Sequence, residues 1–580
     1  MKLTHIRHLA AIAVAAQLAM SASAAPIDNY SDLVDAVAGA ATGDTIKLKA
    51  GTIDVTSTIT ITKGITLSGG WTDDSTRADG AVTVLDGGDL STCDQVLWIR
   101  AKTAEGSVTL DSLCLTHGYV RGLRQGNSAS SPYNSCDLAI TNCQFVANGS
   151  ARKGENGTGA YLNMDGGSSR PVVTIRDSLF AGNIITNPAA TGPYGGGLYA
   201  FKLSSLVVEN CDFITNGVPF SVAGAGYTTS TTPCNNGFFG TAIYANGVPT
   251  SISNCRFLGN FARQGSTVCF YGASGGSSIS NCLFAANQHN VVSGGWSADN
   301  FGTINVQMSA LADTLEISGC TIAYNACGSA GAAAGLMVKT GTVNVRDSIL
   351  FGNRVASNST VGSEITVGES GAVNLAYSLV TGSSDAYCSG SIVAGTGVIY
   401  GDPLFVTDDA TVLSKLTRGT SMAYYDPTKT TQEETIGFDL HLRSKVGYFL
   451  NDGTLVENGT ESSPAIDAAD PTSDFSREGD PNGARRNLGF YGNTAEASRS
   501  RLVSAEIESV TISFPNGYSK PDVAVTLADS EDAYTAEIVL YSGIEGAMPD
   551  GWTWTNYVHG AAQGSTSILS PNEYLTAGDT

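Results

Sequence analysis

A nine-residue pattern of apolar and polar positions recurs along the middle of the chain. It reads ITNCQFVAN at 140–148, VENCDFITN at 208–216, ISNCRFLGN at 252–260 and ISNCLFAAN at 279–287, with looser copies at 175–183, 317–325 and 345–353. Apolar residues alternate as in a strand with one buried face, but the alternation slips by one position at the third residue. The slip predicts a bend between two short strands.

The residues at the slip are Asp111, Asn142, Asp177, Asn210, Asn254, Asn281, Gly319 and Asp347. Asn, Asp and Gly accept left-handed backbone angles at low cost. We therefore predict a structural bend ladder whose members are Asn142, Asp177, Asn210, Asn254, Asn281 and Asp347.

An asparagine closes each copy six residues after the bend. The closing residues are Asn148, Asn183, Asn216, Asn260, Asn287, Asn325 and Asn353, with His117 at this place in the first copy and Ser383 in a degenerate last copy. Glycine-led strands such as GAYLNM (159–164) and GGGLYA (195–200) precede most copies. Stacked turns of this kind pair each strand with its counterpart in the next turn. The sequence predicts an all-β fold, a parallel β-helix with a structural asparagine ladder.

The chain has 12 cysteines. Cys143, Cys211, Cys255, Cys282 and Cys320 occupy the position after the bend, and Ser112, Ser178 and Ser348 are assigned to the same position in other copies. Alternation of Cys with Ser favours small, unbridged core side chains, while a chain of disulfides is the alternative. The other cysteines could pair with one another. No Cys or His spacing indicates a metal site, and no motif indicates a cofactor.

The two ends of the chain differ from the repeats. Residues 1–24 combine basic residues, the apolar run 9–20 and small residues, as in a signal peptide, so we expect export to the extracellular space or the cell surface, including the outer membrane. No later segment has the apolar length of a transmembrane helix. We expect the β-helix with an N-terminal helical cap over 25–405, its end and a further module over 406–500, and a β-sandwich-like segment over 501–580.

The repeats resemble those of right-handed parallel β-helix proteins of the pectin-lyase-like superfamily. The opening stretch DLVDAVAGAATGDTIKLKAGTI (32–53) and the motif LSGGW (67–71) carry this resemblance. The alternation of GGGLYA-like and FxxN motifs resembles the repeats of polymorphic outer-membrane proteins. SSPAIDAADP (462–471) with GARRNLGFYG (483–492) resembles the choice-of-anchor module of bacterial surface proteins. The resemblance implies a right-handed coil; the fold itself hosts lyases, hydrolases and adhesins.

Charge and candidate chemistry leave two functions open. The net charge of −22 disfavours nucleic acid as a partner. No catalytic constellation stands out, and Arg121 and Arg124 fit a solvated loop. The favoured reading is a non-catalytic, adhesin-like protein, monomeric, that binds carbohydrate or a host or cell surface. The alternative is a polysaccharide lyase or glycoside hydrolase, which three or more acids with an Arg or Lys in one external groove would favour. Tyr227, Phe238 and Phe239 mark a possible glycan-contact loop.

Overall fold

A computed structural model describes most of the chain. The described residues are 25–88, 93–126, 135–150, 156–164, 170–185, 194–217, 240–262, 265–273, 275–289, 302–327, 333–355, 363–382, 387–409, 411–412, 436–437, 439–500, 507–513, 522–527, 540–542 and 555–557. The chain forms two compact units, residues 1–478 with 485–498 and residues 479–484 with 499–580. The predicted signal peptide lies outside the described residues.

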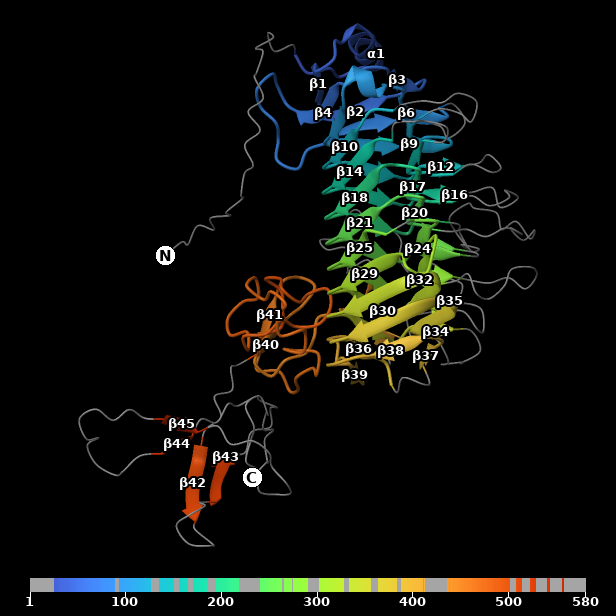
Figure 1. The fold of residues 1–580 in the computed structure, drawn as a ribbon. Coiled ribbons are helices and arrows are strands. Elements are labelled where there is room, and N and C mark those ends of the chain that lie inside the picture. Colours follow the sequence, from blue (N-terminus) through green and yellow to red (C-terminus); the bar gives the residue numbers. More distant parts are fainter. Residues whose placement is uncertain are drawn as a thin grey trace, which may run out of the picture. The chain divides into compact units, whose positions relative to one another are not determined.

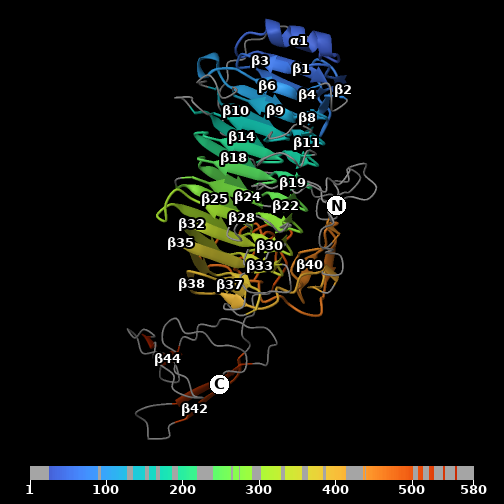
Figure 2. The ribbon, with the colours of Figure 1, turned by 90° about the vertical axis from the view of Figure 1, so that its right-hand side faces the viewer.

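Three columns of stacked strands build the first unit (Figures 1 and 2). The first column contains β1 (Thr45–Lys49), β4 (Thr66–Trp71), β7 (Val108–Asp111), β10 (Leu138–Thr141), β14 (Val172–Arg176), β18 (Ser205–Glu209), β21 (Thr250–Ser253), β25 (Ser277–Ser280), β29 (Thr314–Ser318), β32 (Leu336–Arg346), β35 (Ile365–Ala376) and β38 (Ile392–Ala394). The second column contains β2 (Gly51–Asp54), β5 (Thr83–Asp86), β8 (Leu113–Thr116), β11 (Gln144–Val146), β15 (Leu179–Ala181), β19 (Asp212–Ile214), β22 (Arg256–Leu258), β26 (Leu283–Ala285), β30 (Thr321–Ala323), β33 (Ile349–Phe351), β36 (Leu379–Val380) and β39 (Ile399–Tyr400).

The third column consists of the strands that begin the repeats. It contains β3 (Ile59–Ile61), β6 (Gln95–Ile99), β9 (Arg121–Gln125), β13 (Ala160–Asn163), β17 (Leu198–Phe201), β20 (Ile243–Asn246), β24 (Ser266–Tyr271) and β28 (Gly302–Gln307), and it continues through β32 and β35 to β37 (Cys388–Ser389). Short strands continue the coils after the second column: β12 (Gly149–Ser150), β16 (Ile184–Ile185), β23 (Phe261–Ala262), β27 (Gln288–His289), β31 (Ala326–Cys327) and β34 (Arg354–Val355).

Every pairing within these columns is parallel, and the register is unbroken except for irregularities in the pairs β1–β4, β28–β32 and β32–β35. Ile140 of β10 pairs with Ile175 of β14, and Phe145 of β11 pairs with Phe180 of β15. The fold is therefore a right-handed parallel β-helix, which confirms the predicted fold class. The helix α1 (Tyr30–Gly39) covers its N-terminal end, with Leu33 and Val37 buried and the Asn29 side chain accepting a hydrogen bond from the Asp32 backbone nitrogen at 3.0 Å.

In the coils from β7–β8 to β35–β36, the first and second columns meet at a single left-handed residue. Asn142, Asp177, Asn210, Asn254, Asn281 and Asp347 have φ values between 48° and 52°, and Gly319 has 61°. These are the positions at which the sequence pattern slips. One left-handed residue rotates the chain enough for the next strand to face the interior again.

The coil that contains β7 and β8, the first copy of the predicted repeat, differs by one residue from its predicted alignment. Asp111 pairs with Thr141, so the bend lies at Ser112, with φ 53°, and not at Asp111. Leu113 then takes the position that Cys143 holds in the next coil, because Leu115 pairs with Phe145. The closing position is consequently Gly118 and not His117. The larger Leu113 in a slot that otherwise holds Cys or Ser hid this shift in the sequence.

The closing asparagines form a buried ladder of side-chain amides. In each step the backbone nitrogen and Nδ2 of one asparagine donate to Oδ1 of the asparagine in the next coil, as Asn216 does to Asn260 at 3.0 Å for both bonds. Nδ2 also donates to a backbone carbonyl, for example from Asn260 to Phe213 at 2.8 Å. The ladder runs from Asn148 to Asn353, and each member is at most 2% exposed.

The slot after the bend is a hydrogen-bonding position rather than only a small one. The Cys255 thiol donates to the Ser253 carbonyl at 3.1 Å and accepts from the Cys211 backbone nitrogen at 3.4 Å. Ser178 makes the equivalent bonds, donating to the Arg176 carbonyl at 2.7 Å and accepting from the Cys143 nitrogen at 3.1 Å. Cysteines in the described residues are unbridged, and burial raises the pKa of the Cys143 thiol to about 12.

The described residues of 402–478 and 485–498 leave the coil and pack on the outer face of the second column; we call these residues the side module (Figures 1 and 2). Phe405, Leu442, Leu488 and Tyr491 form one apolar cluster with outward residues of the second column such as Leu283, Ile349 and Leu379. The module contains the antiparallel pair β40 (Gly447–Phe449) and β41 (Leu455–Glu457).

The second unit contains the antiparallel pairs β42 (Ile507–Ser513) with β43 (Asp522–Leu527), and β44 (Leu540–Ser542) with β45 (Thr555–Tyr557). The remainder of the predicted β-sandwich-like segment lies outside the described residues. Over the part of the chain that the structure covers, no helix has the length and apolar character needed to cross a membrane.

Candidate functional site

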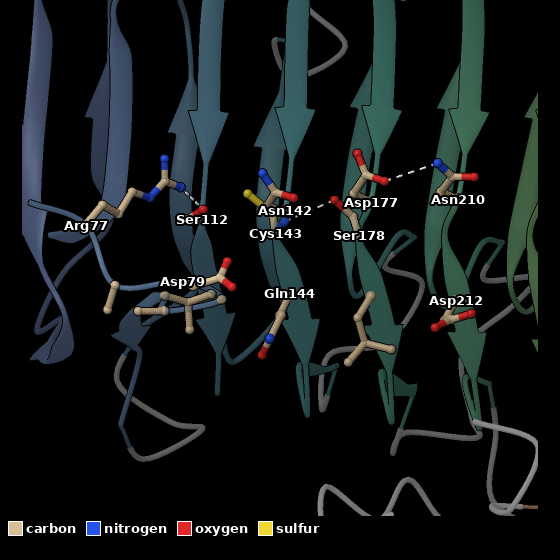
Figure 3. A pocket seen from close by; sticks show the side chains of 15 residues that line it. Arg77, Asp79, Ser112, Asn142, Cys143, Gln144, Asp177, Ser178, Asn210 and Asp212 are labelled. Atoms are coloured by element: carbon tan, nitrogen blue, oxygen red, sulfur yellow. Dashed lines mark hydrogen bonds between the residues drawn. The ribbon is translucent and has the colours of Figure 1, made fainter. Parts of the chain in front are cut away.

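An open hollow of about 740 Å³ lies along the bends between the first and second columns (Figure 3). We call it the trough. Its lining residues are Arg77–Val82, Ser112, Asn142, Cys143, Gln144, Asp177, Ser178, Leu179, Asn210 and Asp212. The bends of three successive coils form its floor, because Asn142, Asp177 and Asn210 are exposed there. Gln144, Leu179 and Asp212 are outward-facing residues of the second column.

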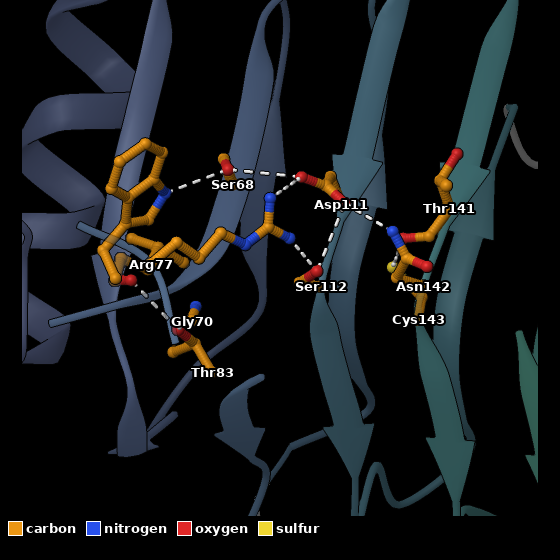
Figure 4. A network of polar contacts seen from close by, with 11 residues as sticks. Ser68, Gly70, Arg77, Thr83, Asp111, Ser112, Thr141, Asn142 and Cys143 are labelled. Atoms are coloured by element: carbon orange, nitrogen blue, oxygen red, sulfur yellow. Dashed lines mark hydrogen bonds and ion pairs between the residues drawn. The ribbon is translucent and has the colours of Figure 1, made fainter. Parts of the chain in front are cut away.

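A loop after β4 closes one end of the trough. Arg77 Nη1 lies 2.7 Å from Asp111 Oδ2, and its Nη2 donates to the hydroxyl of Ser112 (Figure 4). Asp111 in turn accepts a hydrogen bond from Asn142 Nδ2 at 3.3 Å. The loop is held by Asp73, whose carboxylate accepts from the backbone nitrogens of Ser75 and Thr76; these bonds lower the pKa of Asp73.

Polar side chains on the floor are linked from coil to coil. Asp177 Oδ1 accepts a hydrogen bond from Asn210 Nδ2 at 3.2 Å. Asp212 in β19 forms a two-pronged ion pair with Arg256 in β22, at 2.7 Å from Nε and 3.1 Å from Nη2. The stacking of coils therefore fixes the carboxylate of Asp212 in orientation, as bidentate Arg pairs do.

The side module covers the same row of bends further along the stack. Arg486 Nη2 donates to Asn281 Oδ1 at 2.7 Å, and Asp347 is buried. The Asp347 carboxylate accepts from the Asp470 backbone nitrogen at 2.7 Å and from the Ser473 hydroxyl at 2.6 Å. The exposed part of the bend row is thus the stretch between the loop that carries Arg77 and the side module.

A buried histidine lies in the side module near this boundary. His441 Nδ1 is 2.7 Å from Asp439 Oδ1, its Nε2 is 3.7 Å from Glu496 Oε2, and its ring stacks on Tyr491 at 3.6 Å between centroids. Burial lowers the pKa of His441, but the two carboxylates outweigh burial and raise it overall. Glu496 has a lowered pKa, mainly through His441 and with a contribution from Arg256.

Acids outnumber bases in the trough. Asp79, Asp177 and Asp212 line it together with one cation, Arg77, which gives these lining residues a net charge of −2. Arg77 and the adjacent Arg256 are both ion-paired. A neutral or cationic ligand fits this balance better than a polyanion. Among the residues the structure describes, no group of three or more His, Cys, Asp or Glu side chains is arranged to hold a metal ion.

The trough combines residues that linear sequence reasoning separated. Asp177 and Asn210 were predicted as bend residues, whereas Arg77, Asp79 and Asp212 were not predicted as site residues. Three acids with an arginine in one external groove is the arrangement that favours the enzyme alternative. Tyr227, Phe238 and Phe239 lie outside the described residues. Arg121 and Arg124, which the sequence suggested for a loop, lie in strand β9, and Arg121 is buried.

Comparisons with known proteins return structures and no sequence relatives. No family model matches the chain, and no curated protein matches it. A family 6 alginate lyase in complex with a trisaccharide is similar with a TM-score of 0.31 and 11% identity, over 65% of this chain and 87% of the lyase.

A mannuronic-acid-specific family 6 lyase from human gut microbiota has a TM-score of 0.28 and 12% identity over 67% of this chain and 90% of its own. A family 6 polysaccharide lyase from Pseudopedobacter saltans has a TM-score of 0.25 and 11% identity, over 70% of this chain and 97% of its own. Similarity at this level says nothing about what this chain acts on.

Proposed function

We propose that the chain is a carbohydrate-active enzyme that hydrolyses a neutral or weakly charged polysaccharide in the trough. The observation that carries this proposal is the convergence of Asp79, Asp177 and Asp212 with Arg77 on one open hollow. Hydrolysis of a glycosidic bond uses two carboxyl groups, one that protonates the leaving oxygen and one that activates water or attacks the sugar. An open trough suits a polymer, because a chain can lie across several coils.

Asp177 and Asp212 are the carboxyl pair in this proposal. Asp212 lies two residues after Asn210, to which Asp177 is hydrogen-bonded, so the two acids belong to adjacent coils. The ion pair with Arg256 orients Asp212, and we assign it the role of base. Asp177, which accepts from a neutral amide, is assigned the role of acid. Asp79 and Gln144 lie on the side of this pair that faces Arg77 and would bind sugar hydroxyls (Figure 3).

The test is a polysaccharide screen that measures new reducing ends. The wild-type chain, Asp177→Asn and Asp212→Asn are compared, with Asp35→Asn on the exposed face of α1 as the matched control. Asn at position 177 keeps the bend, because Asn142 and Asn210 hold the same position in neighbouring coils. We expect each trough variant to lose at least a hundredfold in activity and the control to keep it. Activity that survives in both trough variants would overturn the proposal. An unsaturated product that absorbs ultraviolet light would show that the bond is cleaved by elimination and not by hydrolysis.

Carbohydrate binding without turnover is the second candidate. It is favoured by the bonds that already link Asp177 and Asp212 of the trough, and the adjacent Asp111, to neighbouring coils: Asp177 to Asn210, Asp212 to Arg256 and Asp111 to Asn142. These bonds give each acid a structural role. Binding of a polysaccharide that the trough variants weaken, with no product formed over prolonged incubation, would favour this candidate over hydrolysis.

We further infer that the chain is exported through residues 1–24 and works outside the cell or on its surface as a monomer. The choice-of-anchor-like sequence features lie in the side module. Sequencing the N-terminus of protein recovered from culture medium or envelope fractions tests the export; an intact Met1 in a cytoplasmic fraction would contradict it.

A further inference from the structure

The outer face of the third column carries a second group of side chains suited to a ligand. Strands β6, β9, β13 and β17 place Trp98, Arg124, Tyr161 and Tyr199 at paired positions, so that they form one row across the strands. Arg100 follows β6, and Arg121 begins β9. We call these six residues the arginine–aromatic row. The row is on the third column, whereas the trough follows the bends between the first and second columns.

Aromatic rings hold the three guanidinium groups of the row. The Cζ atoms of Arg100 and Arg124 each lie 4.7 Å from the Trp98 ring centroid. Arg121 Cζ lies 4.5 Å from the centroid of Tyr161, which stacks on Tyr199 at 5.0 Å. Trp98 Nε1 donates to the Gly126 carbonyl at 2.9 Å, which fixes the indole. Guanidinium groups held in this way lose little freedom when they bind a ligand.

Two of the three arginines of the row, Arg100 and Arg124, have no carboxylate partner among the described residues, and Arg124 Nε is buried without a hydrogen bond. This is unusual in a chain with 53 acidic and 31 basic side chains, where counterions are abundant. Two cations on one indole repel each other. Each contact between a cation and a ring offsets about 0.5–1 kcal/mol of this repulsion. The contacts leave guanidinium N–H groups free to donate to an anion.

We propose that the arginine–aromatic row binds a glycan in which acidic sugars are spaced among neutral ones. Carboxylate or sulfate groups would accept paired hydrogen bonds from Arg100 and Arg124, which is the geometry a guanidinium offers. The half-exposed Trp98 and Tyr161 would pack against the sugar rings between the acidic groups. A densely charged polymer such as nucleic acid is disfavoured, because the net charge of −22 repels it beyond the row. This site is independent of the proposed hydrolysis in the trough.

Dextran and lightly carboxymethylated dextran are matched probes for this site, because they differ only in charge. Binding is measured by affinity electrophoresis or calorimetry at two salt concentrations. We expect the wild-type chain to bind carboxymethyl-dextran and not dextran, with weaker binding at high salt. A lightly sulfated dextran, run in parallel, distinguishes sulfate from carboxylate as the preferred anion.

Arg100→Gln/Arg124→Gln should weaken binding of carboxymethyl-dextran at least tenfold. The control Arg170→Gln/Arg477→Gln removes the same charge from exposed positions and should bind as wild type. Arg100→Lys/Arg124→Lys keeps the charge but loses the paired hydrogen bonds; it should bind several-fold more weakly and serves if the Gln variant does not fold. Asp177→Asn/Asp212→Asn, which tests the trough, should leave this binding unchanged.

Four results would overturn the proposal. They are equal binding by the wild type and both row variants, equal binding of dextran and carboxymethyl-dextran, absence of binding to both anionic polymers, and tighter binding of single-stranded DNA than of either polymer. A loss of binding in the trough variant alone would assign the anionic glycan to the trough instead.

Discussion

Glu364 ends the buried amide ladder by binding Asn353 with both carboxylate oxygens. Oε1 accepts from the Asn353 backbone nitrogen at 3.1 Å, and Oε2 accepts from Asn353 Nδ2 at 2.5 Å. The carboxylate thus takes the place of the asparagine amide that accepts these two bonds in each step of the ladder from Asn148 to Asn353. Its side chain is fully buried, and burial raises the pKa of Glu364 to about 7 in spite of these bonds.

The first prediction is a pH dependence of stability at this end of the ladder. An acid with a raised pKa in the folded state binds its proton more tightly there than in the unfolded chain. Stability should therefore fall as the pH rises from about 4.5 to about 7, and change no further above that. Glu364→Gln cannot ionise. Its stability relative to wild type should improve by up to about 3 kcal/mol across this window, measured by urea unfolding at each pH.

Glu457→Gln, at the exposed end of strand β41, is the control for the loss of one carboxylate, and it should follow the wild-type profile. A constant difference between Glu364→Gln and wild type from pH 4 to 8 would show that Glu364 does not titrate in this window.

The second prediction concerns the slot after the bend. Cys255→Ser should be nearly neutral, since Ser178 donates and accepts in the same way. Cys255→Ala should cost about 1–3 kcal/mol, because the buried Cys211 backbone nitrogen loses its acceptor. Cys255→Leu should cost at least as much through overpacking. Chemical denaturation of the three variants measures the order of their free energies of unfolding. If Cys255→Ala costs as little stability as Cys255→Ser, the slot selects for size alone.

The third prediction compares two asparagines of one coil. The Asn260 side chain makes four hydrogen bonds in the ladder, so Asn260→Leu should destabilise the fold by about 3 kcal/mol or more. Asn254→Gly should be close to neutral, because Asn254 is exposed and Gly319 holds the equivalent bend. Thermal unfolding distinguishes the two, and similar losses in both would refute the distinction between a buried ladder and an exposed bend.

The fourth prediction concerns His441 in the side module. Its raised pKa means that the protonated ring contributes stability below about pH 6.5, its usual value, and that this contribution is lost as the pH rises through the folded-state pKa. Backbone amides of residues 439–498 should therefore exchange hydrogen faster at high pH than the intrinsic rate explains. His441→Gln should remove this additional exchange at high pH. His117→Gln, which changes a half-exposed side chain outside the side module, is the control and should leave the additional exchange unchanged.

The repeat was readable from the sequence because its constraints are local. Each copy holds its left-handed bend, the slot after the bend and the closing asparagine within nine residues. Positions such as Asn210, Cys211 and Asn216 can therefore be recognised together as one short motif. The first coil was misaligned by one residue because Leu113 fills a slot that otherwise holds a smaller side chain. The sequence also suggested that the slot selects for size, whereas the thiols and hydroxyls there make hydrogen bonds.

The trough and the ladder end were not readable, because they depend on contacts between separate segments. Arg77 reaches Asp111 from a loop with no repeat pattern. Glu364, immediately before strand β35, takes the place of an asparagine; it lies eleven residues after Asn353 and outside the repeated motif. The cover over Asp347 comes from residues more than one hundred positions later.

The amide ladder gives the stack a direction. Each asparagine offers its oxygen to the coil before it and its two donors to the coil after it, as Asn216 and Asn260 do. A partly formed stack that grows from the N-terminal end therefore always presents two unused donors at its tip, and every arriving coil supplies the matching acceptor. In such growth each tip would serve as the template for the next coil, as the end of a filament does for the next monomer. Glu364 is the terminator that accepts the last two donors.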